Sequence, residues 1–296
     1  MRVNEKSRFK TAFFAVINAV LWAYFCYNRL MTIKLIATDM DGTFLDGKGA
    51  YDKQRFDRVL SQLSEQDIHF VAASGRQLLA LEAMFSAFTD RIIFVAENGG
   101  IVKYQDQILF EEKMPFDQVL AIAEFVRLSD FIEGDSVLLS GAKGSYILET
   151  ADVHARKKAA MYYENIQIVS DFSTVVDDIL KLTVSFKPET VLEGEAWLNA
   201  QLMGARAVTT GLASIDIIPS GISKETGLSH LAEKFKIQPS EILAFGDNLN
   251  DLEMLTYAGT SFAMLNARDE VKAVADDVIG HHDDAAVMTY LENLVK

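Results

Sequence analysis

The apolar residues of this chain gather in short runs that are separated by stretches of helical periodicity. Strands are predicted where apolar, often β-branched residues stand together and give way to polar residues. Such runs cover 33–38, 68–73, 92–96, 214–218, 242–245 and 260–264. Between the first two runs, Phe56, Val59, Leu60 and Leu63 recur at helical spacing. This alternation of strands and helices predicts an α/β domain.

A middle stretch, 115–212, has a different pattern, in which helices mix with short strands that can be antiparallel. Helices are predicted over 119–126, 154–162 and 189–203, and strands over 136–139, 145–148, 180–186 and 205–209. The Gly-Ala-Lys-Gly turn at 141–144 lacks the spacing of a phosphate-binding loop and predicts a hairpin. We therefore expect an α+β module inserted into an α/β domain formed by 31–114 and 213–296.

The segment 1–30 differs from the rest of the chain. Four basic residues in the first ten positions precede an apolar run over 11–27, and Arg29 closes that run. Such a run is at the lower limit for crossing a bilayer. It is an extension before a true start at Met31, a membrane anchor, or an amphipathic helix of a soluble protein. We favour a start at Met31 and a cytoplasmic protein; the alternative is anchoring in a membrane through 11–27.

The composition narrows the range of functions. With 50% hydrophobic residues the chain can bury a large core, and its net charge of −14 argues against a nucleic-acid partner, because the phosphate backbone needs a basic surface. A phosphorylated ligand would need local positive charge. Cys26 is the single cysteine of the sequence, which excludes a disulfide framework, a thiolate metal cluster and a cysteine nucleophile in the main body.

Two carboxylates stand at the end of the first predicted strand. Because side chains alternate along an extended backbone, Asp39 and Asp41 project to the same side and Met40 turns away. The carboxyl ends of parallel strands are where open α/β sheets bind ligands. Two close anions call for a hard cation such as Mg²⁺, which favours phosphoryl chemistry. The alternative is an Asp-rich turn without a ligand.

The string Asp39-Met40-Asp41-Gly42-Thr43 resembles the first motif of the haloacid dehalogenase-like superfamily. In the phosphatases of that family the first Asp is the nucleophile and the second is the general acid and base. The resemblance implies that Asp39 attacks phosphorus and forms an aspartyl-phosphate, while Asp41 protonates the leaving oxygen and then activates water. The chain has Phe before the leucine at position 45, where the family usually has Leu directly. We interpret this change as one of packing.

Further motifs follow in the order of the family. Ser74-Gly75-Arg76 resembles the second motif, in which a hydroxyl and neighbouring amides hold the phosphoryl oxygens. Asn98 stands where related enzymes carry an Asn-Gly near the substrate. Lys224 follows the inserted module and resembles the third motif, a lysine that screens charge between nucleophile and phosphate. Without the resemblance, the first two would predict turns and the lysine a surface residue.

The fourth motif follows the strand 242–245. Its pattern, Gly-Asp-x-x-Asn-Asp, contains Asp247, Asn250 and Asp251. The resemblance implies that Asp247 completes a metal site with Asp39 and Asp41. It also implies that Asn250 contacts substrate or phosphate and that Asp251 orients the metal site.

Together the motifs resemble those of the Cof-type phosphatases. The resemblance implies a Rossmann-like, doubly wound parallel sheet with 115–212 as a cap, and Mg²⁺-dependent hydrolysis of phosphomonoesters of small metabolites, either sugar phosphates or phosphorylated cofactors. A metal-free dehalogenase is a rival within the superfamily. The alternatives outside catalysis are a sugar-phosphate-binding regulator and a membrane-anchored regulatory protein on the same fold.

The adjacent histidines at 281 and 282, and the single histidine at 69, lie outside these motifs. His281-His282-Asp283-Asp284 has the composition of a metal cluster, but adjacent histidines on a regular element point in different directions, so we predict that Asp283 caps a helix. His69 lies within an apolar run and is predicted to pack in the core.

Overall fold

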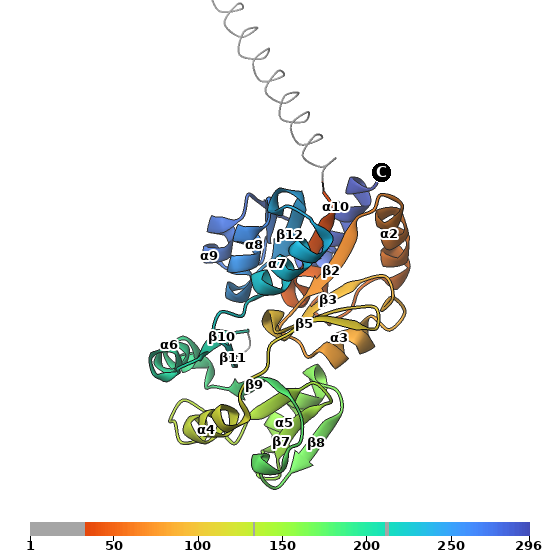
Figure 1. Ribbon diagram of the computed structural model, residues 1–296. Coiled ribbons are helices and arrows are strands. Elements are labelled where there is room, and N and C mark those ends of the chain that lie inside the picture. Colours follow the sequence, from red (N-terminus) through yellow and green to blue (C-terminus); the bar gives the residue numbers. More distant parts are fainter. Residues whose placement is uncertain (1–32, 133, 211–212) are drawn as a thin grey trace, which may run out of the picture.

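The computed structural model describes residues 33–132, 134–210 and 213–296 (Figure 1). Within these residues, eight strands form one sheet in the order β14-β13-β12-β1-β2-β3-β4-β5. They are β1 (Leu35–Thr38), β2 (His69–Ala73), β3 (Ile93–Ala96), β4 (Ile101–Tyr104), β5 (Gln107–Glu111), β12 (Ile242–Gly246), β13 (Thr260–Met264) and β14 (Asp277–Ile279). The strands from β14 to β3 are parallel, and the hairpin β4–β5 extends the sheet in antiparallel fashion. The chain adds strands first on one side of β1 and later on the other.

Helices cover both faces of this sheet. They are α2 (Lys53–Glu65), α3 (Leu78–Met84), α7 (Lys224–Phe235), α8 (Leu252–Tyr257), α9 (Asp269–Val274) and α10 (Ala286–Leu294). Helices α2 and α10 pack together on one face, and α7 and α8 pack together on the other. The predicted doubly wound α/β core is confirmed.

An aromatic cluster explains the extra phenylalanine in the first motif. Phe44 is buried, and its ring centroid lies 5.1 Å from that of Phe56 on α2 and 5.7 Å from that of Phe70 on β2. Packing of this kind contributes burial and favourable ring contacts. The residue therefore fixes the loop after β1 to the core, as predicted.

The second domain, the cap, lies below the core in Figure 1. Its sheet has the order β10-β11-β9-β6-β7-β8. The strands are β6 (Leu138–Gly141), β7 (Ser145–Leu148), β8 (Ile166–Val169), β9 (Ile179–Ser185), β10 (Ala205–Thr209) and β11 (Ser214–Pro219), and the helices are α4 (Phe116–Arg127), α5 (Val153–Tyr162) and α6 (Val191–Gln201). The hairpin predicted at 141–144 joins β6 and β7. The α+β character of the inserted module is as expected.

The boundary predicted at residue 213 is wrong. Strand β11 pairs with β10 and β9 in the cap sheet, so the chain returns to the core only after Pro219. An apolar run such as 215–218 has the same pattern in either sheet, which is why the sequence did not distinguish them. Strand β8 was also not predicted.

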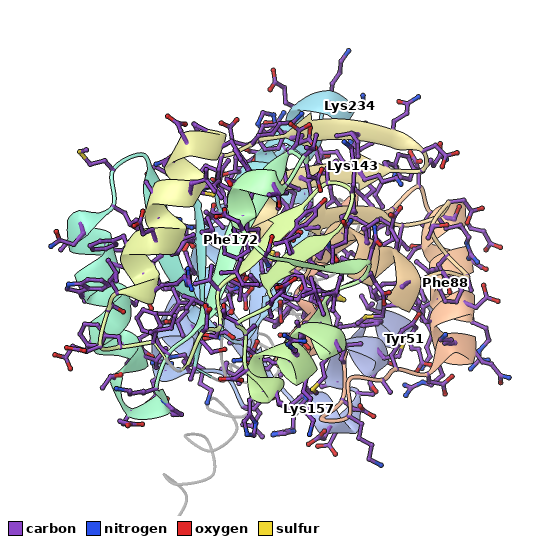
Figure 2. The ribbon with its side chains drawn as sticks, turned by 90° about the horizontal axis from the view of Figure 1, so that it is seen from below. Tyr51, Phe88, Lys143, Lys157, Phe172 and Lys234 are labelled. Atoms are coloured by element: carbon purple, nitrogen blue, oxygen red, sulfur yellow. The ribbon has the colours of Figure 1, made fainter. Side chains whose placement is uncertain are left out.

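The surface and the interior of the molecule differ as expected for packed domains. In Figure 2, Lys157 and Lys234 extend outward from the molecule, while Phe172 lies within the cap, where 5% of it is exposed. His69 is partly buried and stacks on Phe235 of α7 at 4.7 Å, which supports a packing role. Across residues 33–132, 134–210 and 213–296, we find no helix with the length and apolar character needed to cross a bilayer. The predictions for 1–30 lie outside the described residues.

Candidate active site

Two acids meet where the order of the core strands reverses. Asp39 follows β1 and Asp247 follows β12, and these strands are parallel neighbours with Thr38 opposite Phe245. The backbone N–H of Asp39 donates to the carbonyl of Phe245 at 3.0 Å. Such a reversal creates a crevice at the carboxyl ends of the strands, where α/β proteins bind ligands. The fold thus brings together two residues that are far apart in sequence.

The loop between Asp39 and Thr43 is shaped for close approach. Gly42 has φ = 82°, and a Cβ atom at this position would lie 2.4 Å from Oδ2 of Asp247. Only glycine combines this backbone conformation with this contact. The hydroxyl of Thr43 donates to Oδ1 of Asp247 at 3.1 Å, so the loop also orients that carboxylate.

Lys224 is the first residue of α7, and it is completely buried among carboxylates. Ser223 caps the helix in a reciprocal pair with Thr226. A cation at a helix N-terminus opposes the helix dipole, but Nζ of Lys224 lies 2.5 Å from Oδ1 of Asp39 and 2.6 Å from Oδ1 of Asp251. These contacts offset the cost and hold the lysine beside the predicted nucleophile.

Asp251 supports the site by accepting three hydrogen bonds. Its Oδ1 accepts from Lys224, and its Oδ2 accepts from the backbone N–H groups of Asp247 and Asn248 at 2.9 and 3.0 Å. A carboxylate with these partners fixes both the lysine and the loop that carries Asp247. This geometry agrees with an orienting role.

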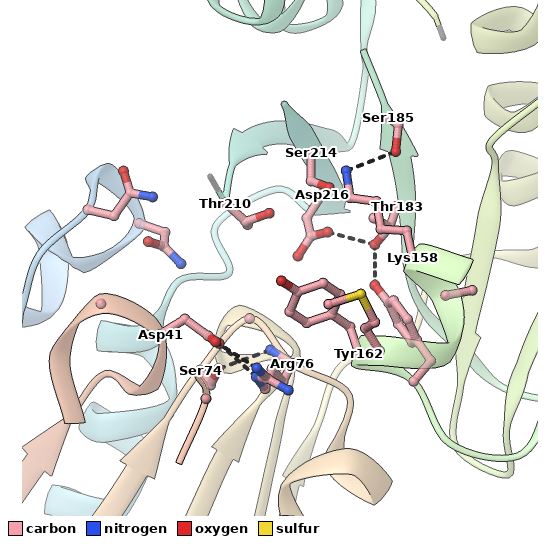
Figure 3. Close-up of a pocket in the computed structure, with 18 of the residues that line it drawn as sticks. Asp41, Ser74, Arg76, Lys158, Tyr162, Thr183, Ser185, Thr210, Ser214 and Asp216 are labelled. Carbon is pink, nitrogen blue, oxygen red and sulfur yellow. Dashed lines mark hydrogen bonds and ion pairs between the residues drawn. The ribbon is translucent and has the colours of Figure 1, made fainter. Parts of the chain in front are cut away.

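Asp41 and Arg76 form an ion pair on the core side of the cavity (Figure 3). The guanidinium of Arg76 donates to both carboxylate oxygens of Asp41, at 2.7 and 2.6 Å. The side chain of Asp41 is 46% exposed, in contrast to that of Asp39, which is 8% exposed. The side chain of Asp41 is therefore held by Arg76, and the carboxylate grouped with Asp39 and Asp247 is that of Asp251.

Asn98 and Asn250 contact each other beneath the cap. Nδ2 of Asn250 donates to Oδ1 of Asn98 at 3.0 Å, and Nδ2 of Asn98 donates to Oδ2 of Asp216 at 2.7 Å. Asn98 has φ = 55°, which asparagine tolerates better than most residues. Ser74 lies nearby at the end of β2, and its Oγ accepts from the N–H of Arg76 at 3.1 Å. All of the sequence-predicted site residues thus lie in one region.

A cavity of about 810 Å³ opens between the core and the cap. That volume suits a small-molecule ligand. Its core side is lined by seven residues that the sequence analysis names as site residues: Asp39, Asp41, Ser74, Gly75, Arg76, Asp247 and Asn250. Its cap side is formed by polar residues of β9 and β11 and by one face of α5. Ligands can therefore contact both domains at once.

Burial and charge set the protonation of the acids. Burial, and next the charge of Asp251, raises the pKa of Asp247 to about 7. Burial raises the pKa of Asp39 well above its usual range against the opposing attraction of Lys224. Three carboxylates thus share one ammonium group. Ionising them all requires further positive charge.

The donor set fits a hard divalent cation. Carboxylate oxygens of Asp39, Asp247 and Asp251 all lie within 4.8 Å of one another. Oxygen ligands from one or two carboxylates are those that Mg²⁺ prefers. The carboxylate of Asp41, which we expected in the metal site, is not part of this group, because Arg76 holds both of its oxygens. With Asp251 already bonded to Lys224 and two N–H groups, Asp39 and Asp247 are the side chains that would hold the ion.

Several residues of the site were not predicted. Thr43 orients Asp247, and Lys181, Thr183 and Asp216 form the cap side. In β9 and β11 polar residues alternate with apolar ones, a pattern that places the polar ones on a single face. That alternation was the available signal.

The prediction for Asp283 is wrong. Its Oδ1 accepts from the N–H of Gly47 at 2.7 Å, and α10 begins after Ala285 without a side-chain cap. The rings of His281 and His282 also lie together, with centroids 4.7 Å apart, and do not diverge. His282 bonds the carbonyl of Leu45 through Nδ1 at 2.8 Å. Through these two hydrogen bonds, His282 and Asp283 hold the loop that follows the first motif in place.

Three known proteins are similar to this chain over most of its length. A 5-amino-6-(5-phospho-D-ribitylamino)uracil phosphatase of Escherichia coli is 34% identical over 267 residues, which are 90% of this chain and 97% of that protein. A Bacillus subtilis enzyme with the same name is 26% identical over 87% of this chain and 96% of its own. A crystal structure from Streptococcus mutans UA159 matches with a TM-score of 0.83 and 32% identity, covering 88% of this chain and 98% of that one.

The family comparison covers both domains and all four motifs. The profile of the haloacid dehalogenase-like hydrolases matches residues 36–291. This span begins in β1 and ends in α10, so core and cap belong to one family unit. The chain therefore belongs to the haloacid dehalogenase-like hydrolases, as a Cof-type phosphatase of the phosphoric monoester hydrolase class.

Proposed function

We propose that this protein hydrolyses phosphomonoesters in a Mg²⁺-dependent reaction that passes through an aspartyl-phosphate on Asp39. The observation that carries the proposal is the position of Asp39, whose buried carboxylate lies 2.5 Å from Lys224 and lines the cavity beside Asp41 and Asp247. The carboxylate oxygen that Lys224 does not contact is the one left to attack.

In the first step, an oxygen of Asp39 forms a bond to phosphorus while the bond to the leaving oxygen breaks. Asp41 donates a proton to that leaving oxygen. In the second step, Asp41 takes a proton from water, the water oxygen attacks phosphorus, and Asp39 is released. Arg76 orients Asp41 through its paired hydrogen bonds, and Ser74 offers its hydroxyl to a phosphoryl oxygen.

Bound Mg²⁺, held by Asp39 and Asp247, would supply positive charge against the charge of the phosphoryl group. Lys224 favours the ionised form of Asp39, orients its carboxylate and shields the nucleophile from the approaching anion. Asp251 holds Lys224 in place. Asn250 lines the cavity, where its side chain also contacts Asn98. From this position Asn250 can donate a hydrogen bond to the substrate.

For the substrate we propose a phosphorylated polyol attached to a flat ring. The cap side of the cavity carries Thr183, Ser185, Ser214 and Asp216, whose hydroxyl and carboxylate groups match a chain of hydroxyls. Leu138, Ile147, Ala155 and Ala159 form an apolar part suited to a ring. Because two relatives are named for 5-amino-6-(5-phospho-D-ribitylamino)uracil, this compound is the first candidate.

The test measures phosphate release from an aryl phosphate and from a panel that includes this compound and simple sugar phosphates. We expect turnover with Mg²⁺, none with EDTA, and none in Asp39→Asn. Asp57→Asn, which changes an exposed aspartate paired with Arg91 on the outer surface, is the matched control. Turnover by Asp39→Asn at the wild-type rate would refute the mechanism.

The same assay separates the alternatives. A sugar-phosphate-binding regulator would bind members of the panel without releasing phosphate. A cytoplasmic location, which we also propose, is tested by fractionating the native protein. Recovery in membranes alone would favour the anchored alternative.

A further inference from the structure

Lys181 belongs to the cap, but its ammonium group lies against the core. It stands in the middle of β9, and 2% of its side chain is exposed. Its Nζ donates to the carbonyl of Gly75 in the core and to Oδ2 of Asp216 in the cap, the latter at 3.0 Å. Oε2 of Glu97, also in the core, lies 3.1 Å away. Lys181 thus connects the domains through buried contacts.

The arrangement around Lys181 is energetically demanding. Burying an ammonium group costs several kcal/mol unless carboxylates and hydrogen bonds compensate. Burial lowers the pKa of Lys181, and the charges of Asp216 and Glu97 together raise it well above the usual value, so the group stays charged. Glu97 and Asn98 have φ of 52° and 55°, conformations that cost energy in residues other than glycine. A site this costly indicates a role beyond filling space.

The contact with Gly75 completes the support of the phosphoryl-binding loop. This loop, 74–76, has three carbonyl groups, and each accepts from a different donor. Ser74 O accepts from Asn98 N, and Arg76 O accepts from Glu97 N, both at 3.0 Å and both within the core. Gly75 O accepts from Lys181 of the cap. Two of these supporting hydrogen bonds therefore come from the core itself, and the third comes from the cap.

The third support, from Lys181, acts on the peptide unit between Gly75 and Arg76, two residues that line the cavity. The carbonyl of Gly75 and the N–H of Arg76 belong to one planar peptide and point in opposite directions. A cation on the carbonyl fixes the N–H toward Oγ of Ser74, to which it donates at 3.1 Å. Because Oγ then accepts one bond, the Ser74 proton is free to donate to a phosphoryl oxygen.

A second cap residue contacts the same loop. The guanidinium of Arg76 lies over the ring of Tyr162 on α5, 4.9 Å from the ring centroid (Figure 3). The same guanidinium holds both carboxylate oxygens of Asp41. The cap therefore touches the loop at two points that lead directly to Ser74 and Asp41.

We propose that Lys181 is a positioning residue of the phosphatase reaction, through which the seated cap fixes the Gly75–Arg76 peptide and gives the phosphoryl-binding loop its working geometry. The inference rests on the proposed function in one respect, the role of Ser74 in binding the phosphoryl group. Lys181 then affects every phosphorylated substrate equally, whatever its leaving group.

The first experiment compares Lys181→Met with the wild type and with Lys113→Met. Lys113 is a matched control, because it also links core to cap, through Glu111 and Asp178, but it is 43% exposed and does not touch the loop. We measure kcat and KM on an aryl phosphate and on the best metabolite of the panel, and the inhibition constant of inorganic phosphate. Loss of a buried, charged hydrogen bond predicts a fall of about tenfold to a hundredfold in kcat/KM on both substrates.

Inorganic phosphate separates positioning from other roles, because it has no leaving group. Its inhibition constant should rise in Lys181→Met and stay at the wild-type value in Lys113→Met. A loss confined to the metabolite would mean that Lys181 binds the leaving group, and unchanged kinetics would mean a purely structural role; either result overturns the inference. If Asp39→Asn is also active, the proposed function fails; if it is inactive while Lys181→Met is normal, only this inference fails.

Lys181→Met leaves two buried carboxylates without their cation and can fail to fold. The double variant Glu97→Gln/Lys181→Met keeps the net charge of the cluster, because one negative and one positive charge are removed together. The glutamine introduced by Glu97→Gln can still accept from Ser140, as Glu97 does at 2.8 Å. Comparison of this double variant with Glu97→Gln isolates Lys181. The same tenfold or larger loss on both substrates is expected, and equal rates would contradict the inference.

Discussion

Replacing Asp39 with asparagine should stabilise the protein in the absence of metal while abolishing turnover. At an effective dielectric constant of about 20, Lys224 at 2.5 Å attracts Asp39 by about 7 kcal/mol. Asp247 and Asp251, whose oxygens lie within 4.8 Å, repel it by at least about 3.5 kcal/mol each. These contributions nearly cancel, so the cost of removing the Asp39 carboxylate from water decides the sign.

That cost is several kcal/mol for a buried ion. The neutral asparagine side chain avoids it and still offers an oxygen to Lys224, which keeps Asp251 as its ionic partner. We therefore expect the free energy of unfolding of Asp39→Asn in EDTA to exceed that of the wild type by about 1–3 kcal/mol. This difference corresponds to a rise in Tm of roughly 2–12 °C for a chain of this size.

Saturating Mg²⁺ should cancel or reverse this difference in stability. A ligand at a hundred times its Kd stabilises the native state by about 2.7 kcal/mol. The wild type should gain this stabilisation and Asp39→Asn should lose most of it, because one of the proposed ligands is neutral. Thermal melts of both proteins, in EDTA and in saturating Mg²⁺, test the crossing, with Asp57→Asn as control. A lower Tm for Asp39→Asn in EDTA, or equal gains from Mg²⁺, would refute the charge balance.

The roles of the other acids and of the amino-terminal segment can be tested in the same way. Asp41→Asn should lose most activity on poor leaving groups but less on activated aryl phosphates, which need little protonation, and a plot of rate against leaving-group pKa measures the difference. Burial raises the pKa of Asp247 from 3.8 to about 7. The proton on Asp247 therefore stabilises the metal-free protein fully below pH 3.8, and this stabilisation is lost as the pH rises from 3.8 to about 7. Mg²⁺ affinity, measured by calorimetry, should increase over the same range and then level off. A chain that begins at Met31 should be monodisperse and fully active, because β1 starts only a few residues later, at Leu35; loss of activity in gel-filtered protein would show that 1–30 contribute to the fold.

The core site was predictable because its geometry follows from strand periodicity and sheet topology. Asp39 and Asp247 each end an apolar run, and parallel strands bring their carboxyl ends to one edge. Lys224 has no such signal, because a lysine at a helix start is usually exposed. Its role was indicated by the resemblance of the motifs in their order, and its contacts became visible only in the structure.

The cap side of the site could not be predicted in the same way. The polar residues Lys181, Thr183 and Ser185 alternate along β9, which fixes that they share a face. Nothing in that alternation tells whether the face meets solvent, a helix or another domain. The placement of the cap over the core decides it, and this placement arises from contacts between distant segments. Asp283 illustrates the same limit, since a local capping pattern was overridden by a bond to Gly47.

The charge of the molecule gives the cap a role beyond selection of the leaving group. The chain has a net charge of −14, and the core side of the cavity presents Asp39, Asp41 and Asp247 to an anionic substrate. The cap contributes Lys158 to the same cavity, together with Lys181, whose charge is paired with Asp216 and Glu97. Coulomb attraction between these groups and a phosphate grows as water is excluded from the space between them. The seated cap therefore places an ammonium group on one side of a cavity whose core side holds acids, and we expect bound Mg²⁺ to add positive charge from the core side. Because both charges would attract one phosphoryl group, we expect the cap to contribute to phosphate binding as well as to recognition of the leaving group.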